Sequence, residues 1–344
     1  MVLPLNHRPR TWVLGLSVAL LGNLVALAAG PVDAAADRAG LHQTLEWIRM
    51  PTVQRARYDY VMTVKVRLLF FWIKRDDVGG GYIRRSVSRA DPNLELIEVL
   101  FGSDPAKAPR GINRWGAGTE VVRRAAGDGR LAQASGFIGF MKKSKGESVS
   151  EMKEELAAER AGGRHLFQAI VSRVDPHQAV SQVVPFYSER DFNLHQLEAA
   201  QQLVLERFSD GPLRRLEGEP RETCGATLGF LATLQQLIDL ALEGARAPLS
   251  RCYIYNARTY SATLERLSPK KEEKVKIQYR PSGREVRRTY QDLLEARFKI
   301  RRQESGDSTS FEILLGTQGA LRGVPVQIVH QPNFWFQVVL NLNP

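Results

Sequence analysis

Residues 334–344 read FWFQVVLNLNP, and their apolar side chains recur at every second position. Phe336, Val338, Leu340 and Leu342 share one face of an extended strand with Phe334, whereas the intervening side chains point to the other face. Alternation over this length predicts a half-buried β-strand with its apolar side against a core.

The same period of two occurs in two distant parts of the chain. Residues 61–68 and 82–88 alternate between apolar and polar side chains, and a third strand is expected at 94–101, so strands are predicted within about 58–101. An antiparallel meander of strands joined by short polar turns is expected over about 252–342. Both regions have one apolar face, and we expect them to join in a single curved antiparallel sheet.

The middle of the chain, about 118–246, is expected to be mainly helical. A strand at 165–174 interrupts three predicted helices. The first begins at the Ser148 and Glu151 capping box and ends at Gly162-Gly163; the second is capped by Asp191 or Asn193 and runs to Phe208; the third spans about Gly225 to Glu243, with Leu228, Leu231, Leu234 and Ile238 at helical spacing.

The apolar face of an antiparallel sheet has to be covered, and the central helices are the available cover. The sequence therefore predicts an α+β fold, in which N-terminal and C-terminal strands build a curved antiparallel sheet and central helices pack on its concave face. Residues 37–344 are expected to form one such domain.

The N-terminal region predicts export. Arg8 and Arg10 precede an uncharged apolar run from residue 12 to residue 29, and small residues lead to an Ala-x-Ala pattern that ends at Ala36. We expect residues 1–36 to be a cleaved signal peptide and the remainder to be periplasmic or extracellular. An uncleaved N-terminal membrane anchor is the alternative.

The chain is basic, with 48 Lys and Arg against 37 Asp and Glu and a net charge of +11. In an exported protein this balance favours anionic envelope components, including lipid head groups and acidic polysaccharides, and no nucleic-acid partner is expected. A basic surface that serves only solubility explains the charge equally well.

Cys224 and Cys252 are the only cysteines in the sequence. In an oxidising compartment two cysteines are most simply one disulfide, and two buried free thiols are the alternative.

Residues 68–85, LLFFWIKRDDVGGGYIRR, place three glycines after adjacent aspartates. The pattern lacks the Lys and Ser or Thr of a phosphate-binding loop, and it predicts a chain reversal at 74–81. Asp76 and Asp77 would face opposite sides of a strand, so they do not form an acid and base pair there. Trp72 beside Asp76 and Asp77 is a candidate for the mouth of a ligand-binding site.

Residues 101–124, FGSDPAKAPRGINRWGAGTEVVRR, contain the second candidate. Arg110, Asn113, Arg114 and Trp115 combine guanidinium, amide and indole groups that can hold an anionic or sugar-like ligand. A purely structural loop is the alternative. The Gly-Ala-Gly at 116–118 lacks the third glycine of a dinucleotide-binding fingerprint.

Trp335 is the last binding candidate, because it lies on the face opposite Phe334 and Phe336. On an open sheet face it could contact lipid or ligand, and ordinary packing is the alternative.

No metal or cofactor is expected. His165, His177 and His195 are far apart, and the sequence contains neither His-Glu-x-x-His nor Cys-x-x-Cys. A Gly-x-Ser-x-Gly nucleophile elbow is also missing from the sequence, so we assign no catalytic residue.

The C-terminal third resembles a known class of domain. YNARTYSATLERL, KVKIQY, RFKIRR and FEILLG, followed by Pro325-Val326-Gln327-Ile328, are similar to the C-terminal part of curved-sheet, lipocalin-like periplasmic domains of unknown function. Those domains are similar in shape to the lipoprotein-carrier half-barrels of the envelope. The resemblance implies an open concave sheet partly filled by helices, with an apolar cleft, and it transfers no catalytic residue.

These observations favour non-catalytic binding of an apolar or amphiphilic, lipid-like ligand between sheet and helices. A hydrolase acting on envelope polymer is the first alternative. The second is a structural or assembly factor that binds another envelope protein through an exposed sheet edge.

Overall fold

The computed structural model describes residues 31–68, 71–109, 112–124, 131–143, 165–205, 208, 213–216, 218–224, 229–278 and 285–343. The strands of the first half are β1 (Thr52–Leu68), β2 (Phe71–Ser88), β3 (Leu94–Ser103), β4 (Trp115–Arg124), β5 (Leu131–Lys143), β6 (His165–Val174), β7 (Ala179–Ser188) and β8 (Leu213–Arg215). Those of the second half are β9 (Leu249–Tyr255), β10 (Arg258–Gln278), β11 (Glu285–Arg302), β12 (Ser308–Gly316), β13 (Pro325–Asn333) and β14 (Phe336–Asn343). The helices are α1 (Pro31–Arg49), η2 (Leu194–Gln196), α3 (Leu197–Leu205), α4 (Pro220–Cys224), α5 (Phe230–Leu242) and η4 (Gly319–Leu321).

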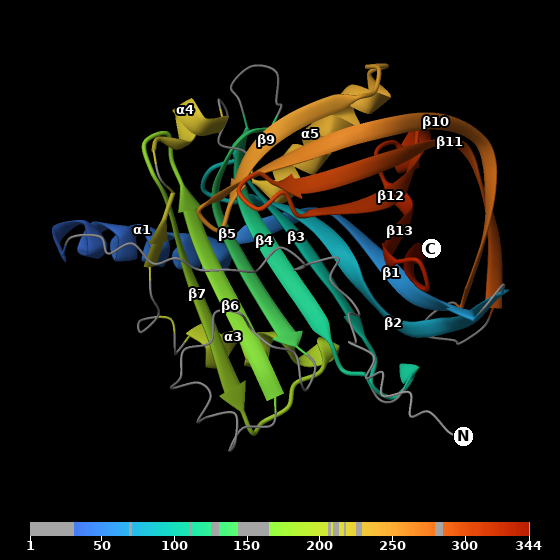
Figure 1. The fold of residues 1–344 in the computed structure, drawn as a ribbon, viewed down its shortest axis with the longest axis horizontal. Coiled ribbons are helices and arrows are strands. Elements are labelled where there is room, and N and C mark those ends of the chain that lie inside the picture. The colour runs from blue at the N-terminus through green and yellow to red at the C-terminus, as the bar shows by residue number, and fades with distance from the viewer. Residues whose placement is uncertain are drawn as a thin grey trace, which may run out of the picture.

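One sheet of 14 strands runs through the described residues, in the order β8-β7-β6-β5-β4-β3-β2-β1-β14-β13-β12-β11-β10-β9. Every neighbouring pair is antiparallel, and each strand lies beside its neighbour in the chain except where β1 pairs with β14. Figure 1 shows that the sheet curls, so that β9–β12 arch over the region of β1–β5.

The pairing of β1 with β14 joins the two halves of the sheet. Val64 lies opposite Val338 and Met62 opposite Leu340, and all four side chains are buried. The predicted union of N-terminal and C-terminal strands in one curved antiparallel sheet is therefore present.

The predicted fold class is wrong, because the protein is mainly β. The segment 118–246, expected to be mainly helical, contains most of β4 and all of β5–β8, and its described helices are short. β6 was expected as a strand at 165–174, but β4 was not: its residues 115–118 and 120–122 are buried, so it is covered on both faces and lacks the period-two signal. The helix predicted from Ser148 lies outside the described residues.

Two of the predicted central helices are present in shorter form. Asn193 caps η2, its side chain accepting a hydrogen bond from the backbone nitrogen of His195 at 2.9 Å, and α3 continues from η2. The third predicted helix corresponds to α5, which begins at Phe230 rather than at Gly225.

The predicted reversal at 74–81 is also wrong, because these residues lie inside β2. The register passes from Val64 opposite Arg75 to Met62 opposite Gly79, so the aspartates form a bulge opposite Thr63. Asp77 has a φ of 52°. Glycine is required at residue 81 because a Cβ there would lie 1.7 Å from the Leu100 carbonyl oxygen of β3. Residues typical of turns serve here in a bulge and a close strand contact.

The helices of the described residues cover both faces of the sheet, and α5 is the long helix on the concave one, where Leu321 of η4 also packs. Leu237 and Ile238 of α5 belong to the largest apolar cluster, together with residues of β1 and β10–β14. Leu41 of α1 and Ala200 of α3 belong to a second cluster with β3–β7. In β6, Ile170 joins the first cluster and Ala169 the second, so the two clusters lie on opposite faces.

The residues of α1 lie on both sides of the predicted cleavage position. Within α1, Asp37 is 1% exposed, and its carboxylate accepts a hydrogen bond from the Arg215 guanidinium of β8. Residues 1–30 lie outside the described part, so signal-peptide cleavage after Ala36 stays a prediction.

The two edges of the sheet approach each other. The Ser181 hydroxyl of β7 donates a hydrogen bond to Asn256 Oδ1, beside β9, over 2.7 Å, and Ile254 of β9 packs with Ala179 of β7. The predicted disulfide is confirmed: Cys224 of α4 is bonded to Cys252 of β9. The curled sheet is therefore fastened where its edge strands meet.

A buried carboxyl group holds the first turn of α5. Gly229, the N-cap residue, offers no side chain, and Glu120 of β4 accepts hydrogen bonds from the backbone nitrogens of Leu231 at 2.8 Å and Ala232 at 2.9 Å. A Cβ on Gly229 would lie 2.7 Å from the Glu120 carboxyl carbon, so the close approach requires glycine. Burial raises the pKa of Glu120 to about 7 and outweighs these hydrogen bonds, which lower it.

We predict that replacing both cysteines by serine (C224S with C252S) lowers the free energy of unfolding by about 3 kcal/mol, because the cross-link restricts the unfolded chain. Urea unfolding of the oxidised proteins measures this difference. Dithiothreitol should destabilise the wild-type protein to the same extent and leave the double variant unchanged. Equal stability of the two oxidised proteins would contradict the prediction.

We also predict a pH dependence that originates at Glu120. The pKa is about 7 in the folded protein and lies near 4.5 in the unfolded chain, so the folded state holds an extra proton between these values. The free energy of unfolding should then decrease as the pH rises through this window, by at most about 1.4 kcal/mol per pH unit.

The variant Glu120→Gln cannot ionise and should lack this part of the slope. Urea unfolding of both proteins across the window tests the assignment. Identical slopes for the wild-type protein and the variant would refute it.

Candidate ligand-binding cavity

A cavity of about 950 Å³ lies between α5 and the concave face of the sheet. We call it the inner cavity. It is lined mainly by apolar side chains from both halves of the sheet and from α5: Ile83, Ile97, Val99, Phe101, Phe137, Phe230, Leu234, Ile238, Ile300, Phe311, Ile313 and Ile328. Its volume is at the upper end of the range of about 300–1,000 Å³ that is typical of small-molecule sites.

Charged side chains line the cavity where β1 and β3 begin and β2 and β4 end. Glu95 is 1% exposed, and its carboxylate accepts hydrogen bonds from Arg85 Nε, at 2.5 Å, and from the guanidinium of Arg124. Arg55 adds a further guanidinium, and it forms no ion pair with a described residue. We call Arg55, Arg85, Glu95 and Arg124 the charged rim. Asp239 and Glu243 of α5 also line the cavity, and Asp239 interacts with the charges of Arg85 and Arg124, so Arg55 is the rim residue that favours an anionic group.

His330 of β13 is the one histidine among the described residues that line the cavity. Its side chain is 3% exposed, and Nδ1 lies 3.1 Å from the Ser310 carbonyl oxygen. A carbonyl can only accept, so Nδ1 carries the proton and Nε2 keeps a lone pair. Burial lowers the pKa of His330 and outweighs the bond to Ser310, which raises it, so the ring is neutral near pH 7.

No described residue bonds His330 Nε2, and a second acceptor lies on α5. Gln236 also lines the cavity, and its buried Oε1 has no hydrogen-bond partner among the described residues. Unpaired buried acceptors are costly unless a ligand or water supplies a donor. The inner cavity thus combines apolar walls, a charged rim and at least two acceptors.

The predicted site residues of β2 do not line the inner cavity. Asp76 accepts a hydrogen bond from Thr63 Oγ1 at 2.7 Å and forms an ion pair with Lys74 at 2.8 Å. Asp77 is buried and pairs with Lys107 at 2.5 Å. Because the two carboxylates have separate partners, they do not act as an acid and base pair, and their contacts are structural.

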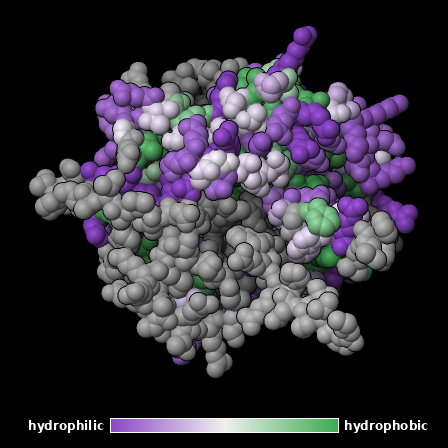
Figure 2. Space-filling view, in the orientation of Figure 1, coloured by the Kyte–Doolittle hydropathy of each residue, from purple (hydrophilic) through white to green (hydrophobic). Residues whose placement is uncertain are grey.

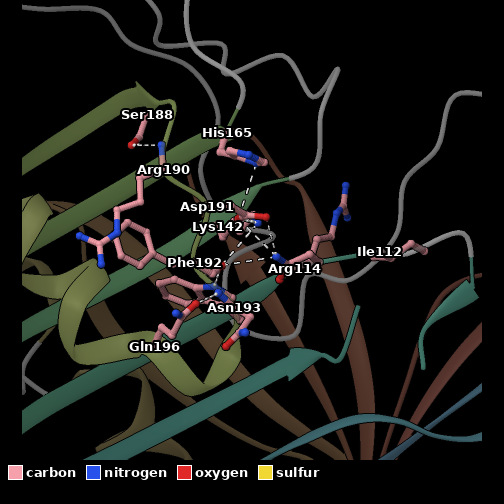
Figure 3. Close-up of polar contacts among 12 residues, drawn as sticks. Ile112, Arg114, Lys142, His165, Ser188, Arg190, Asp191, Phe192, Asn193 and Gln196 are labelled. Carbon is pink, nitrogen blue, oxygen red and sulfur yellow. Dashed lines mark hydrogen bonds and ion pairs between the residues drawn. The ribbon is translucent and has the colours of Figure 1, made fainter. Parts of the chain in front are cut away.

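Asn113 and Trp115 contact a polar cluster around Asp191 and Phe192, which Figure 3 shows. Asn113 Nδ2 donates to Asp191 Oδ2 at 3.1 Å, and Trp115 Nε1 donates to the Phe192 carbonyl oxygen at 3.1 Å. The Lys142 ammonium, which is almost fully buried, also donates to Asp191. These contacts hold the segment after β7 against β4 and β5.

The charges of this cluster are mutually compensated. Burial acts to raise the pKa of Asp191, but the hydrogen bond and charge of Lys142 lower it overall, with a further contribution from His165, whose Nδ1 lies 3.6 Å away. Arg114 is buried, and its backbone pairs with that of Ser103. These contacts agree with the alternative interpretation of residues 101–124 as a purely structural loop.

The other predicted site residues are scattered. Trp72 is exposed in β2, near the reversal between β1 and β2. Trp335 is partly buried against the largest apolar cluster, and Arg110 lies outside the described residues. Phe334, expected on the apolar face, is 71% exposed because β14 begins only at Phe336.

Sequence reasoning missed the residue that distinguishes the inner cavity. His330 follows the buried Val326 and Ile328 at a spacing of two, so it occupies an inward position of the strand. A histidine at an inward position of a strand was the sequence signal that could have identified His330 as a candidate site residue.

The described part of the chain contains no group of three or more His, Cys, Asp or Glu side chains placed to hold a metal ion. None of its helices combines the length and apolarity needed to cross a bilayer.

Comparison with known proteins gives little information on this chain. No family model and no curated protein matches it. Among solved structures it is similar to the "Beta-barrel-like Protein of Domain of Unknown Function DUF1849 from Brucella abortus", with 10% sequence identity and a TM-score of 0.41 over 85% of this chain and 95% of the other.

Proposed function

We propose that the protein binds an apolar or amphiphilic small molecule in the inner cavity, without chemical conversion, as an exported envelope protein. The observation that carries this proposal is the cavity of about 950 Å³ with apolar walls from α5 and both halves of the sheet. Burial of apolar ligand surface against these walls supplies the binding energy. The resemblance to lipocalin-like periplasmic domains is compatible with this role and stays a prediction.

The charged rim and His330 give the ligand an orientation. An anionic group fits beside Arg55, where a guanidinium is present without an ion pair among the described residues. A hydrogen-bond donor on the ligand chain, such as a hydroxyl group, fits His330 Nε2. The site is therefore suited to an acyl chain with an acidic head and a polar substituent.

We predict that dansylaminoundecanoate, a fluorescent acyl-chain probe, binds saturably with one site per chain. Ala56 lines the inner cavity, so the variant Ala56→Trp should fill part of it and weaken probe binding by about tenfold or more. Fluorescence titration measures this affinity.

Val53→Trp is the matched control, because Val53 lies in the same strand, is 44% exposed and does not line the cavity. It should bind the probe as the wild-type protein does. Leu234→Trp on α5 provides a second, independent block. Absence of saturable binding to the wild-type protein, or equal binding by all variants, would rule out the cavity as the site.

The acceptor role of His330 gives a separate prediction. Replacement by leucine removes Nε2 but keeps an apolar side chain of similar size. The affinity for ω-hydroxydodecanoate should fall about tenfold, the loss expected for one buried hydrogen bond, while the affinity for dodecanoate is unchanged. Competition against the fluorescent probe measures both affinities, and equal changes for the two ligands would exclude the hydrogen bond.

A further inference from the structure

The large apolar side chains that are exposed in the described residues concentrate at one end of the sheet. Trp72 is 39% exposed, Ile73 49% and Phe334 71%. The remaining one, Val53, is 44% exposed and lies near the other end of β1. We call Trp72, Ile73 and Phe334 the apolar end.

Two neighbouring hairpins build the apolar end. Trp72 of β2 lies opposite Arg67 of β1, and the Arg67 backbone nitrogen donates a hydrogen bond to the Trp335 carbonyl oxygen over 2.7 Å. The turn from β13 to β14, which contains Phe334, is therefore next to the β1–β2 hairpin. The exposed side chains lie at the ends of the two hairpins.

Basic side chains surround the apolar end. Arg67 and Arg75 are exposed, and neither forms an ion pair with a described residue. Lys65 and Lys74 lie opposite each other on β1 and β2. Burial lowers the pKa of Lys65 and the charge of Lys74 lowers it further, while the carboxylates of Asp76 and Glu273 act in the opposite direction. Figure 1 shows β1, β2, β10 and β11 ending on the right of the molecule, and Figure 2 shows hydrophobic side chains among hydrophilic ones on that side.

We propose that the apolar end docks on the surface of an anionic lipid bilayer. Trp72, Ile73 and Phe334 insert into the interfacial region, where indole and phenyl rings are favoured. Arg67 and Arg75 then reach the lipid phosphate groups, which supply anionic partners that no described residue provides. Protruding aromatic and aliphatic side chains within a basic surround match a fluid, negatively charged surface better than they match a shaped protein partner.

Vesicle flotation tests this proposal, with vesicles of phosphatidylcholine alone and of phosphatidylcholine containing one third phosphatidylglycerol. Each protein is expressed from the full sequence and its N-terminus is read by mass spectrometry, so that all variants are compared in the same form. The wild-type protein should bind the anionic vesicles, and binding should weaken as salt is added.

The variant carrying Trp72→Ser, Ile73→Ser and Phe334→Ser should bind the anionic vesicles at least about tenfold more weakly. Val53→Ser removes an equally exposed apolar side chain elsewhere and should bind as the wild-type protein does. Arg67→Ser with Arg75→Ser should reduce binding to anionic vesicles to the level seen with neutral ones. Phe334→Ser alone, at the most exposed position, should produce part of the loss without any cost in stability.

Three results would overturn the proposal. The first is that the wild-type protein does not bind anionic vesicles. The second is that the triple variant binds them as strongly as the wild-type protein does. The third is that Val53→Ser loses as much binding as the triple variant. Binding of dansylaminoundecanoate by the triple variant should equal that of the wild-type protein, which separates membrane docking from ligand binding in the inner cavity.

Discussion

The pairing of β1 with β14 is the constraint on which the rest of the structure depends. It converts two meanders, each built from hairpins between neighbours in the chain, into one sheet of 14 strands. Because long strands coil with a right-handed twist, a sheet of this width curls, and its concave face needs a cover. The seam consists of buried pairs such as Val64 with Val338, so register and burial support each other.

The concave face is only partly filled, and Glu120 explains how the remaining space is maintained. The Glu120 carboxyl group, which projects from β4, accepts hydrogen bonds from the first turn of α5. At the other end of the helix, Arg322 donates a hydrogen bond to the Leu242 carbonyl oxygen over 3.3 Å. A helix held at both ends cannot settle deeper into the sheet. These polar contacts position α5 over the sheet, and the inner cavity lies between the apolar side chains of α5 and those of the sheet.

The sequence predicted the strands whose two faces differ, and it also predicted β6, which is buried on both faces, but it missed β4 and β5. β1, β14 and the meander after residue 252 alternate clearly, whereas β4 and β5 contain glycine and alanine and have no contrast between faces. Turn residues at 76–81 gave a false reversal, since a bulge uses the same backbone angles as a turn. The cavity was expected between sheet and helices. The period of two places His330 on an inward position, but the residues that it faces there depend on long-range strand pairing.

The positions of the charged rim and the apolar end relate the two proposals. Ala56, beside the charged rim, lies near the start of β1, and Arg67, at the apolar end, lies near its finish. His330 pairs with Val338, which pairs with Val64, so His330 lies on the side toward the apolar end. A protein docked through its apolar end would direct the charged rim away from the bilayer. An amphiphile in the adjoining leaflet also has its head group toward water and its chain toward the bilayer interior. It could therefore move between bilayer and inner cavity without inverting, which removes the cost of passing a charged head through an apolar region.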